Sequence, residues 1–276
     1  MKSFIILAVL FIGAALGAPA ENISSFIMGG VNAFPGEFPF MVSIQHFFLG
    51  GSHICGGAIL SQIWVLTAAH CLTETSTRGS IDILAGKHNL NLDEEGQQRI
   101  EIERNRWLVH PGWQAGREYG PFDIALGRLA SPLTFTARIR PIRLPAPGSA
   151  AFGPITFAGW GADSNGIGSG PVNILQKVMF STITNEVCRD AINDMNGPGD
   201  ILDSTKFCTG PLTGGFSTCE GDFGGPAFQG SPGNEIIVGI ASWGITPCGI
   251  RGAPTGIYTK VSDFTTWITA NTGISH

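Results

Sequence analysis

Residues 221–226 read Gly-Asp-Phe-Gly-Gly-Pro, a run so rich in glycine that it predicts a tight bend of the backbone. Residues 66–71, Leu-Thr-Ala-Ala-His-Cys, place a histidine after a strand-like run. Residues 122–126, Phe-Asp-Ile-Ala-Leu, place a lone carboxylate at the start of another. Taken singly, His70 is explained as a core histidine, Asp123 as a strand cap and the glycines as a bend. Their meaning depends on the rest of the chain.

Runs of strand length, rich in apolar and β-branched residues, surround these segments at 40–47, 53–60, 63–67, 99–108, 123–129, 155–160, 174–183, 235–243 and 256–261. Gly, Pro, Asn or Ser separate most of them, which predicts an antiparallel β sandwich or barrel. Helices are expected at 185–193 and near the end, where Ser262 or Asp263 caps a segment through Trp267–Ala270. The proline-rich residues 140–147 predict an extended connector between two β units.

The composition excludes several classes of protein. Of the 276 residues, 43% are hydrophobic and 13% are charged, against roughly 25% charged in an ordinary soluble domain. Disordered, coiled-coil and polybasic chains are therefore excluded. The net charge of -5 has no basic run within it, so nucleic acid is not an expected partner.

The first residues have the layout of a secretory signal. A basic start precedes the apolar run 4–16 and then small residues, and a cut after Gly17 or Ala20 fits. The run is shorter than the roughly 20 residues that span a bilayer. We therefore expect a signal peptide over 1–17 and a secreted, extracellular protein with no membrane association.

All six cysteines follow this leader: Cys55, Cys71, Cys188, Cys208, Cys219 and Cys248. Secretion takes them into an oxidising compartment, so we expect three disulfides. Spacing alone cannot choose among the possible pairings. A zinc site is the competing interpretation, and the absence of any Cys-x-x-Cys pair in the sequence weighs against it.

In this order, and together with further motifs, the segments resemble the trypsin/chymotrypsin family of serine proteases. The further motifs lie at 27–30 (Ile-Met-Gly-Gly), 55–57 (Cys-Gly-Gly), 156–161 (Thr-Phe-Ala-Gly-Trp-Gly), 242–244 (Ser-Trp-Gly) and 256–261 (Gly-Ile-Tyr-Thr-Lys-Val). The resemblance implies an all-β domain over 27–276, built of two six-stranded antiparallel barrels with a boundary near 140–147 and a short C-terminal helix. It also implies the disulfides Cys55–Cys71, Cys188–Cys208 and Cys219–Cys248.

The family's mechanism needs a hydroxyl nucleophile whose proton passes to a histidine that an aspartate orients. The resemblance assigns the histidine to His70 and the aspartate to Asp123, but the nucleophile position holds Phe223. A phenyl ring has no lone pair to attack a carbonyl and no proton to give. The N–H groups of Gly221 and Phe223 match the oxyanion hole, and the ring is expected to occupy the space of the substrate carbonyl.

The same resemblance places substrate-binding residues. Ser217 matches the floor of the primary specificity pocket, where the absence of a carboxylate removes the partner for a Lys or Arg side chain. Ser242 matches a residue of the cleft, and Gly244 and Gly256 match the glycines that leave the pocket walls open. If the pocket is open, we expect it to be apolar and chymotrypsin-like.

Activation in the family frees an isoleucine ammonium that pairs with a buried aspartate, and the matching residues are Ile27 and Asp222. Phe26 precedes Ile27, and no Lys or Arg occurs between Lys2 and Arg78, so a trypsin-like enzyme cannot release the pro-segment 18–26. A chymotrypsin-like enzyme could. In the uncut chain, His53 either pairs with Asp222 or is a strand histidine satisfied by backbone.

No metal or cofactor is expected. Some family members bind calcium on a surface loop that residues 86–95 resemble. Lys87 stands where an acidic ligand is needed, and its ammonium is expected to repel the ion and to pair with Glu94 or Glu95.

The leading functional hypothesis is a secreted, monomeric pseudoprotease. It would bind proteins or peptides, including protease inhibitors or active proteases, in a regulatory role. The alternative is an active chymotrypsin-like endopeptidase, if Phe223 is a sequencing error or a rare variant. A third possibility is a purely structural or adhesive protein that binds nothing in the cleft.

Overall fold

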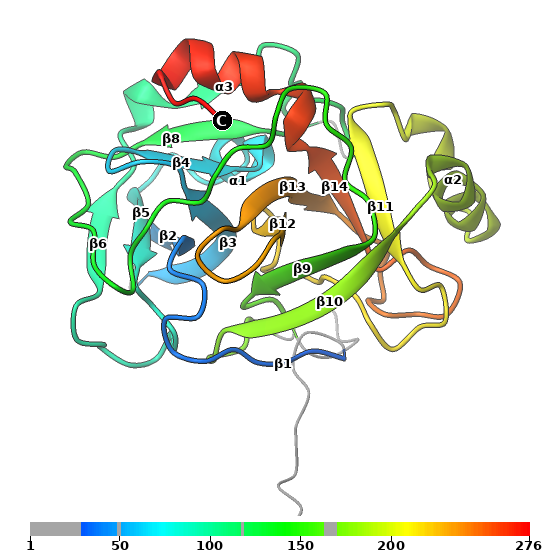
Figure 1. The fold of residues 1–276 in the computed structure, drawn as a ribbon, viewed down its shortest axis with the longest axis horizontal. Coiled ribbons are helices and arrows are strands. Elements are labelled where there is room, and N and C mark those ends of the chain that lie inside the picture. The colour runs from blue at the N-terminus through cyan, green and yellow to red at the C-terminus, as the bar shows by residue number, and fades with distance from the viewer. Residues whose placement is uncertain (1–28, 49–50, 117–118, 163–169) are drawn as a thin grey trace, which may run out of the picture.

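The computed structural model describes residues 29–48, 51–116, 119–162 and 170–276. Two curled β-sheets lie side by side, with short helices around them (Figure 1). The predicted all-β class is confirmed: the chain forms one closed six-stranded barrel, one curled half-barrel sheet and a short C-terminal helix. The chain passes from the first sheet to the second between β8 (Ala125–Arg128) and β9 (Pro154–Gly159), a stretch that includes residues 140–147.

The first sheet has the strand order β6-β5-β2-β3-β4-β8-β7. Its strands are β2 (Met41–Phe47), β3 (Ser52–Ile59), β4 (Trp64–Thr67), β5 (Ser80–Ala85), β6 (Gln98–Glu101), β7 (Leu108–Val109) and β8 (Ala125–Arg128). The end strands β6 and β7 are not paired with each other, and only an isolated bridge joins Ile102, after β6, to Leu129, after β8. The sheet therefore curls into a half-barrel where the resemblance implied a six-stranded barrel.

The second sheet closes on itself because β10 pairs with both β11 and β9. The barrel strands are β9 (Pro154–Gly159), β10 (Gln176–Ile183), β11 (Lys206–Gly210), β12 (Pro226–Gln229), β13 (Ile236–Trp243) and β14 (Gly256–Lys260). The short β1 (Val31–Asn32) adds to β10. Burial of β11 and β13 along almost their whole length explains why their sequences lack the alternation of a half-exposed strand.

The helices are α1 (Ala69–Thr73), α2 (Asn185–Asp194) and α3 (Thr265–Thr272), with 3-10 turns η1 (Arg104–Arg106), η2 (Gly199–Ile201) and η3 (Val261–Asp263). The expected cap of the last helix is wrong. Ser262 and Asp263 lie in η3, and Asp263 pairs with Lys260 at 2.9 Å, so α3 begins after Phe264 without a side-chain cap. The strand expected over 99–108 is also interrupted, because the polar residues of η1 form a turn between β6 and β7.

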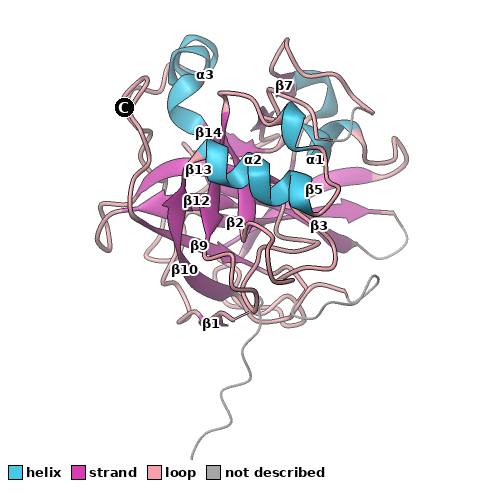
Figure 2. Cartoon of the chain, turned by 90° about the vertical axis from the view of Figure 1, so that its right-hand side faces the viewer, coloured by secondary structure: helices cyan, strands magenta, loops and turns pink. Residues whose placement is uncertain are grey.

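The three disulfides join the pairs that the resemblance implied: Cys55–Cys71, Cys188–Cys208 and Cys219–Cys248. The second one ties α2 to β11. Figures 1 and 2 show α2 outside the strands on that side of the molecule. A disulfide of this kind stabilises the fold mainly by restricting the unfolded chain.

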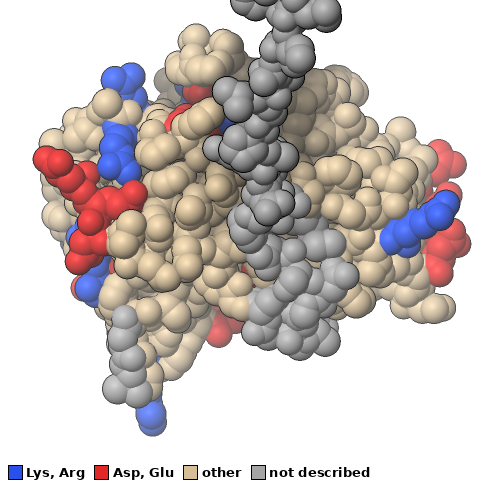
Figure 3. Space-filling model, turned by 90° about the horizontal axis from the view of Figure 1, so that it is seen from below, with Lys and Arg blue, Asp and Glu red and all other residues tan. Residues whose placement is uncertain are grey.

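The predicted leader 1–17, the pro-segment 18–26 and Ile27 lie outside the described residues. Within the described part, no helix combines the length and the hydrophobicity that crossing a membrane requires. On the face seen from below in Figure 3, acidic and basic side chains gather near the two ends.

Candidate active site

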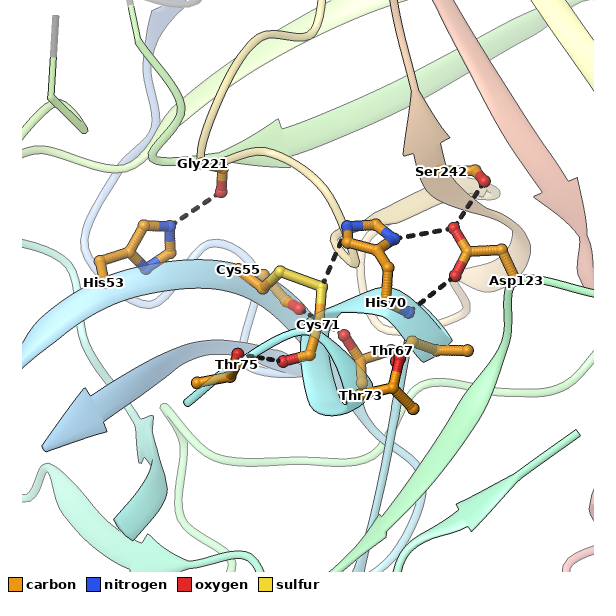
Figure 4. The surroundings of a disulfide bond; sticks show 12 residues. His53, Cys55, Thr67, His70, Cys71, Thr73, Thr75, Asp123, Gly221 and Ser242 are labelled. Atoms are coloured by element: carbon orange, nitrogen blue, oxygen red, sulfur yellow. Dashed lines mark hydrogen bonds and ion pairs between the residues drawn. A yellow bond between two sulfur atoms is a disulfide. The ribbon is translucent and has the colours of Figure 1, made fainter. Parts of the chain in front are cut away.

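The pairing of β4 with β8 brings the predicted histidine and aspartate together. Thr67 at the end of β4 lies opposite Ala125 at the start of β8, so His70 and Asp123 emerge at the same edge of the sheet. The Nδ1–H of His70 donates to Asp123 Oδ2 at 2.9 Å, and its backbone N–H donates to Oδ1 at 3.0 Å (Figure 4). Because a carboxylate only accepts, these bonds place a proton on Nδ1.

The second barrel contributes Ser242, at the end of β13. Its hydroxyl donates at 2.6 Å to Asp123 Oδ2, the same oxygen that accepts from His70 Nδ1 (Figure 4). Asp123 is 2% exposed, and each of its carboxylate oxygens accepts at least one hydrogen bond. The carboxylate is therefore held by both halves of the molecule.

The charges of the pair stabilise each other. Burial by itself would lower the pKa of His70, but the negative charge and hydrogen bond of Asp123 raise that pKa above its usual value. Burial would raise the pKa of Asp123, and the attraction of His70 reverses this and lowers it. The geometry thus supports an ionised Asp123 that orients His70, the arrangement needed in a general base.

The turn over 221–226 has open hydrogen-bond donors. Gly221 adopts a φ of 92°, and the N–H groups of Gly221 and Phe223 donate to no acceptor among the described residues. The Phe223 carbonyl accepts from Gly56 N at 2.8 Å, which anchors the turn to β3. Two unoccupied N–H groups on an anchored turn are the elements of an oxyanion hole.

The ring of Phe223 lies beside His70. Their centroids are 5.8 Å apart at an interplanar angle of 76°, an edge-to-face contact. The phenyl group also packs against the hydrophobic core, and Nε2 of His70 lies 3.6 Å from the Sγ of Cys71. The imidazole nitrogen that would take a nucleophile's proton therefore has an aromatic side chain and a disulfide beside it.

His53, on β3, bonds to backbone. Its Nε2–H donates to the Gly221 carbonyl at 2.8 Å (Figure 4). Its Nδ1 lies 2.8 Å from Ser43 Oγ. Of the two roles considered for His53, the structure therefore has the backbone-satisfied one. Burial lowers the pKa of His53 to about 4, against the opposing effect of the bond to Gly221.

The carboxylate of Asp222 is fully buried and accepts from two backbone groups, Gly161 N at 2.8 Å and Cys219 N at 2.9 Å. Burial raises the pKa of Asp222 to about 7, although these two bonds act in the opposite direction. Because Ile27 lies outside the described residues, the predicted pairing of its ammonium with Asp222 stays a prediction.

A cavity of about 280 Å³ opens beside these groups, and its lining includes His70, Asp123, Phe223, Ser242 and Gly244. Ser217 and Gly256 are not among the described residues that line it. The buried Ser217 hydroxyl donates to the Thr218 carbonyl, and a Cβ on Gly256 would lie 2.5 Å from the Tyr258 hydroxyl. At the rim of the cavity, the Tyr119 ring packs on Trp243 with centroids 4.8 Å apart.

A larger cavity, of about 420 Å³, lies along β10 and β12, and none of the predicted site residues lines it. The chemistry of the predicted residues therefore belongs to the smaller cavity.

One buried charge at the site was missed by the sequence analysis. Lys206, on β11, is 2% exposed, and its Nζ donates to Ser242 Oγ and Thr259 Oγ1 at 2.9 Å each. No strand was predicted for β11, so nothing in the sequence pattern pointed this lysine inward. A lysine four residues before Gly210 and two before the disulfide cysteine Cys208 was the only available signal.

The loop over 86–95 does not suit calcium. The Lys87 ammonium is buried in it and donates to the Leu92 carbonyl and to Gln97 Oε1, so a cation occupies the oxygens that calcium would need. The expected partner was wrong: Glu94 instead accepts from the backbone N–H of His88 and pairs with Arg138.

Among the described residues, one group has the spacing of metal ligands: Cys55, His70 and Cys71. Both of its cysteines are oxidised in one disulfide, and metals bind the thiolate form. This group therefore does not fit a metal ion.

The chain is similar in sequence to known proteins. The family described as Trypsin matches residues 27–268. The chain is 36% identical over 248 residues to trypsin-1 of Astacus astacus, covering 89% of this chain and 99% of the relative. It is 32% identical over 268 residues to cationic trypsin-3 of Rattus norvegicus, covering 97% of each. It is 34% identical over 269 residues to ovochymase-2 of Mus musculus, covering 92% of this chain and 42% of the relative.

Proposed function

The chain belongs to the trypsin family, and from that premise we propose that it is a secreted member that has lost catalysis and keeps its cleft as a protein-binding surface. A signal peptide over 1–17 and a pro-segment over 18–26 would precede the domain. Three disulfides are consistent with an oxidising, extracellular location. Trypsin-like proteases bind protein substrates or inhibitors, so proteins and peptides are the expected ligands.

One observation carries the proposal: a phenyl ring stands where the family's mechanism needs a hydroxyl, in a turn whose other parts suit catalysis. His70 and Asp123 are bonded at 2.9 Å, and the donors of the oxyanion hole have no acceptor among the described residues. Loss of a serine nucleophile costs about six orders of magnitude in turnover in a worked protease case. The Phe223 ring adds occlusion, since it lines the cavity beside His70.

The intact hydrogen bonds of His70, Asp123 and Ser242 favour one second candidate. If residue 223 is serine in the natural protein, the same geometry supports an active chymotrypsin-like serine endopeptidase. In either case, the open side of Gly244 supports a preference for large apolar groups over basic ones, and so does the resemblance, in which Ser217 supplies no carboxylate. A Cβ placed on Gly244 would meet its nearest neighbour only at 3.9 Å.

The test compares three proteins after cleavage between Phe26 and Ile27: wild type, Phe223→Ser and Phe223→Ala. We expect no peptide hydrolysis by the wild type. Phe223→Ser should hydrolyse peptides after Phe or Leu at least about 10³-fold faster, because it restores the nucleophile and clears the carbonyl site. Phe223→Ala clears the ring without adding a hydroxyl, so it should stay inactive.

Two results would count against this function. Wild-type hydrolysis that a serine-directed phosphonate blocks would show that another residue supplies the nucleophile. A silent Phe223→Ser protein with intact disulfides would show that the cleft has departed from catalysis at further positions, and would favour the structural or adhesive alternative.

A further inference from the structure

The buried Lys206 belongs to the same cluster as Asp123, although it comes from a different barrel. Lys206 lies on β11, and its two hydroxyl partners lie on β13 and β14. Lys206, Ser242 and Thr259 are each at most 5% exposed. The ammonium is therefore removed from water and depends on the groups around it.

Each of the two hydroxyls donates a hydrogen bond to Asp123. Ser242 Oγ donates to the carboxylate at 2.6 Å, and Thr259 Oγ1 donates to the Asp123 carbonyl at 2.9 Å. Since a hydroxyl has one proton, both groups must accept from Lys206. Two hydroxyl bridges thus join the ammonium to Asp123, one to its side chain and one to its main chain.

We propose that Lys206 is a buried counter-cation of Asp123, which keeps the carboxylate ionised and oriented and makes His70 a weaker base. Lys206 is a positioning residue in this account, because it acts through Ser242 and Asp123 and lines no part of the described cavity. The inference deepens the proposed function, since it concerns the same site, but its main test does not use activity.

The surrounding charges give the direction of the effect. Asp123 and Glu74 are the anions that raise the pKa of His70, and Lys206 is the cation that lowers it, while burial also lowers it. Around Lys206 itself, burial lowers the pKa to about 8, against the attraction of Asp123 and Asp203. Removal of the Lys206 charge should therefore make protonated His70 more favourable.

The consequence for catalysis follows from the role of the aspartate. A triad aspartate stabilises the imidazolium that forms when the histidine takes a proton. Here the buried ammonium of Lys206 already offsets part of the negative charge of Asp123. Asp123 therefore stabilises a protonated His70 less than it would without Lys206. Restoring a serine at 223 should then leave a base that Lys206 still weakens.

The experiment follows the His70 imidazole by NMR through a pH titration of wild type, Lys206→Met and Lys260→Met. Lys206→Met removes the ammonium and keeps the rest of the unbranched side chain, and both hydroxyls keep their bonds to Asp123. Lys260→Met is the matched control, because this lysine of β14 bonds to Ser204 and Asp263 instead. We expect the His70 midpoint to rise by about 0.5 pH or more in Lys206→Met alone.

An unchanged His70 midpoint in a folded Lys206→Met protein would overturn the proposal, whatever happens to its stability. If that variant does not fold, the wild type decides: the His70 signals should show a second step near pH 8, together with the Cε signal of Lys206. A single-step His70 titration would reject the coupling.

The Phe223→Ser protein provides a separate readout. Adding Lys206→Met should raise kcat and move the rising limb of the pH profile to higher pH. If Phe223→Ser is silent while the His70 midpoint moves as expected, the proposed loss of activity has a further cause and the role of Lys206 stands.

Discussion

At residue 224 the backbone of the turn lies against the disulfide Cys55–Cys71 so closely that a side chain has no room. Gly224 has a φ of 76°, and a Cβ built on it would lie 2.6 Å from the Gly56 carbonyl oxygen and 2.9 Å from Cys71 Sγ. The backbone position of the neighbouring Phe223 is therefore fixed by the residues on both sides. A substitution at 223 is expected to change the side chain and to leave the path of the turn unchanged.

We predict that Gly224→Ala strongly destabilises the fold. Steric overlap with backbone and disulfide, added to a strained φ, should lower the free energy of unfolding by about 3 kcal/mol or more. Gly96→Ala is the matched control, since Gly96 has a φ of 78° and no atom within 4 Å of a built Cβ. It should cost only about 1 kcal/mol. Denaturant unfolding of both variants measures the difference, and equal losses would show that the turn can relax.

Strand β3 carries His53 from the first sheet to the turn of the second barrel. Its Nε2–H donates to the Gly221 carbonyl and its Nδ1 lies by Ser43 Oγ. The histidine therefore connects β3 to the turn by a hydrogen bond. A neutral imidazole suits both partners, since its Nδ1 can accept from the Ser43 hydroxyl, and burial disfavours the protonated ring. Acid should therefore weaken this contact between the two halves.

We accordingly predict an acid-sensitive contribution from β3. Burial lowers the pKa of His53 to about 4, below its unfolded value of about 6.5, so the folded state binds this proton less well. The stability from His53 is complete above pH 6.5 and is lost as pH falls towards 4, by about 3 kcal/mol. Urea unfolding of His53→Gln should lack this component. An identical pH dependence in wild type and His53→Gln would contradict the assignment.

At the scale of the whole molecule, the two halves meet through backbone as well as side chains. A Cβ on Gly56 of β3 would lie 2.7 Å from the Cα of Gly225, so the sheet and the turn are in direct contact there. Asp222 is buried at this junction with a pKa that burial raises to about 7. Processing of the amino terminus should act on the junction through this carboxylate.

Cleavage after Phe26 should therefore change the stability of the domain. A folded pKa above the unfolded value means that the uncut chain binds the Asp222 proton more tightly when folded, so its stability falls as pH rises from 4 to 7. Cleavage after Phe26 should supply the Ile27 ammonium, reverse this fall and raise the melting temperature at pH 8. Asp222→Asn should remove the difference between cut and uncut protein.

Amino-terminal sequencing and thermal unfolding check this prediction. Trypsin should produce no new terminus at Ile27, because no Lys or Arg lies between Lys2 and Arg78. A terminus at Ile27 after trypsin, or equal melting temperatures before and after chymotryptic cleavage, would contradict it.

Much of the candidate site was predictable from the sequence because short motifs carry it. The stretches around His70, Asp123 and Phe223 are local, and their order along the chain indicated the family, the cysteine pairs and the missing nucleophile. Helix α2 was also predicted nearly to its ends, since its signals are local too. The sequence analysis did not predict β5, β11 and β12. Each of these strands has only four to six residues, most of them buried, so it lacks the alternation of apolar and polar residues that identifies a strand.

Residue type, order and spacing by themselves predicted that Phe223 stands at the nucleophile position, since a phenyl ring lacks a hydroxyl whatever fold surrounds it. Only the tertiary structure decided where the charges lie. Lys206 meets Ser242 and Thr259 across separations of 36 and 53 residues, and His53 meets Gly221 across 168. Contacts of that range form only when the strands pair and the barrel closes. The local sequence around each residue therefore does not predict its partner.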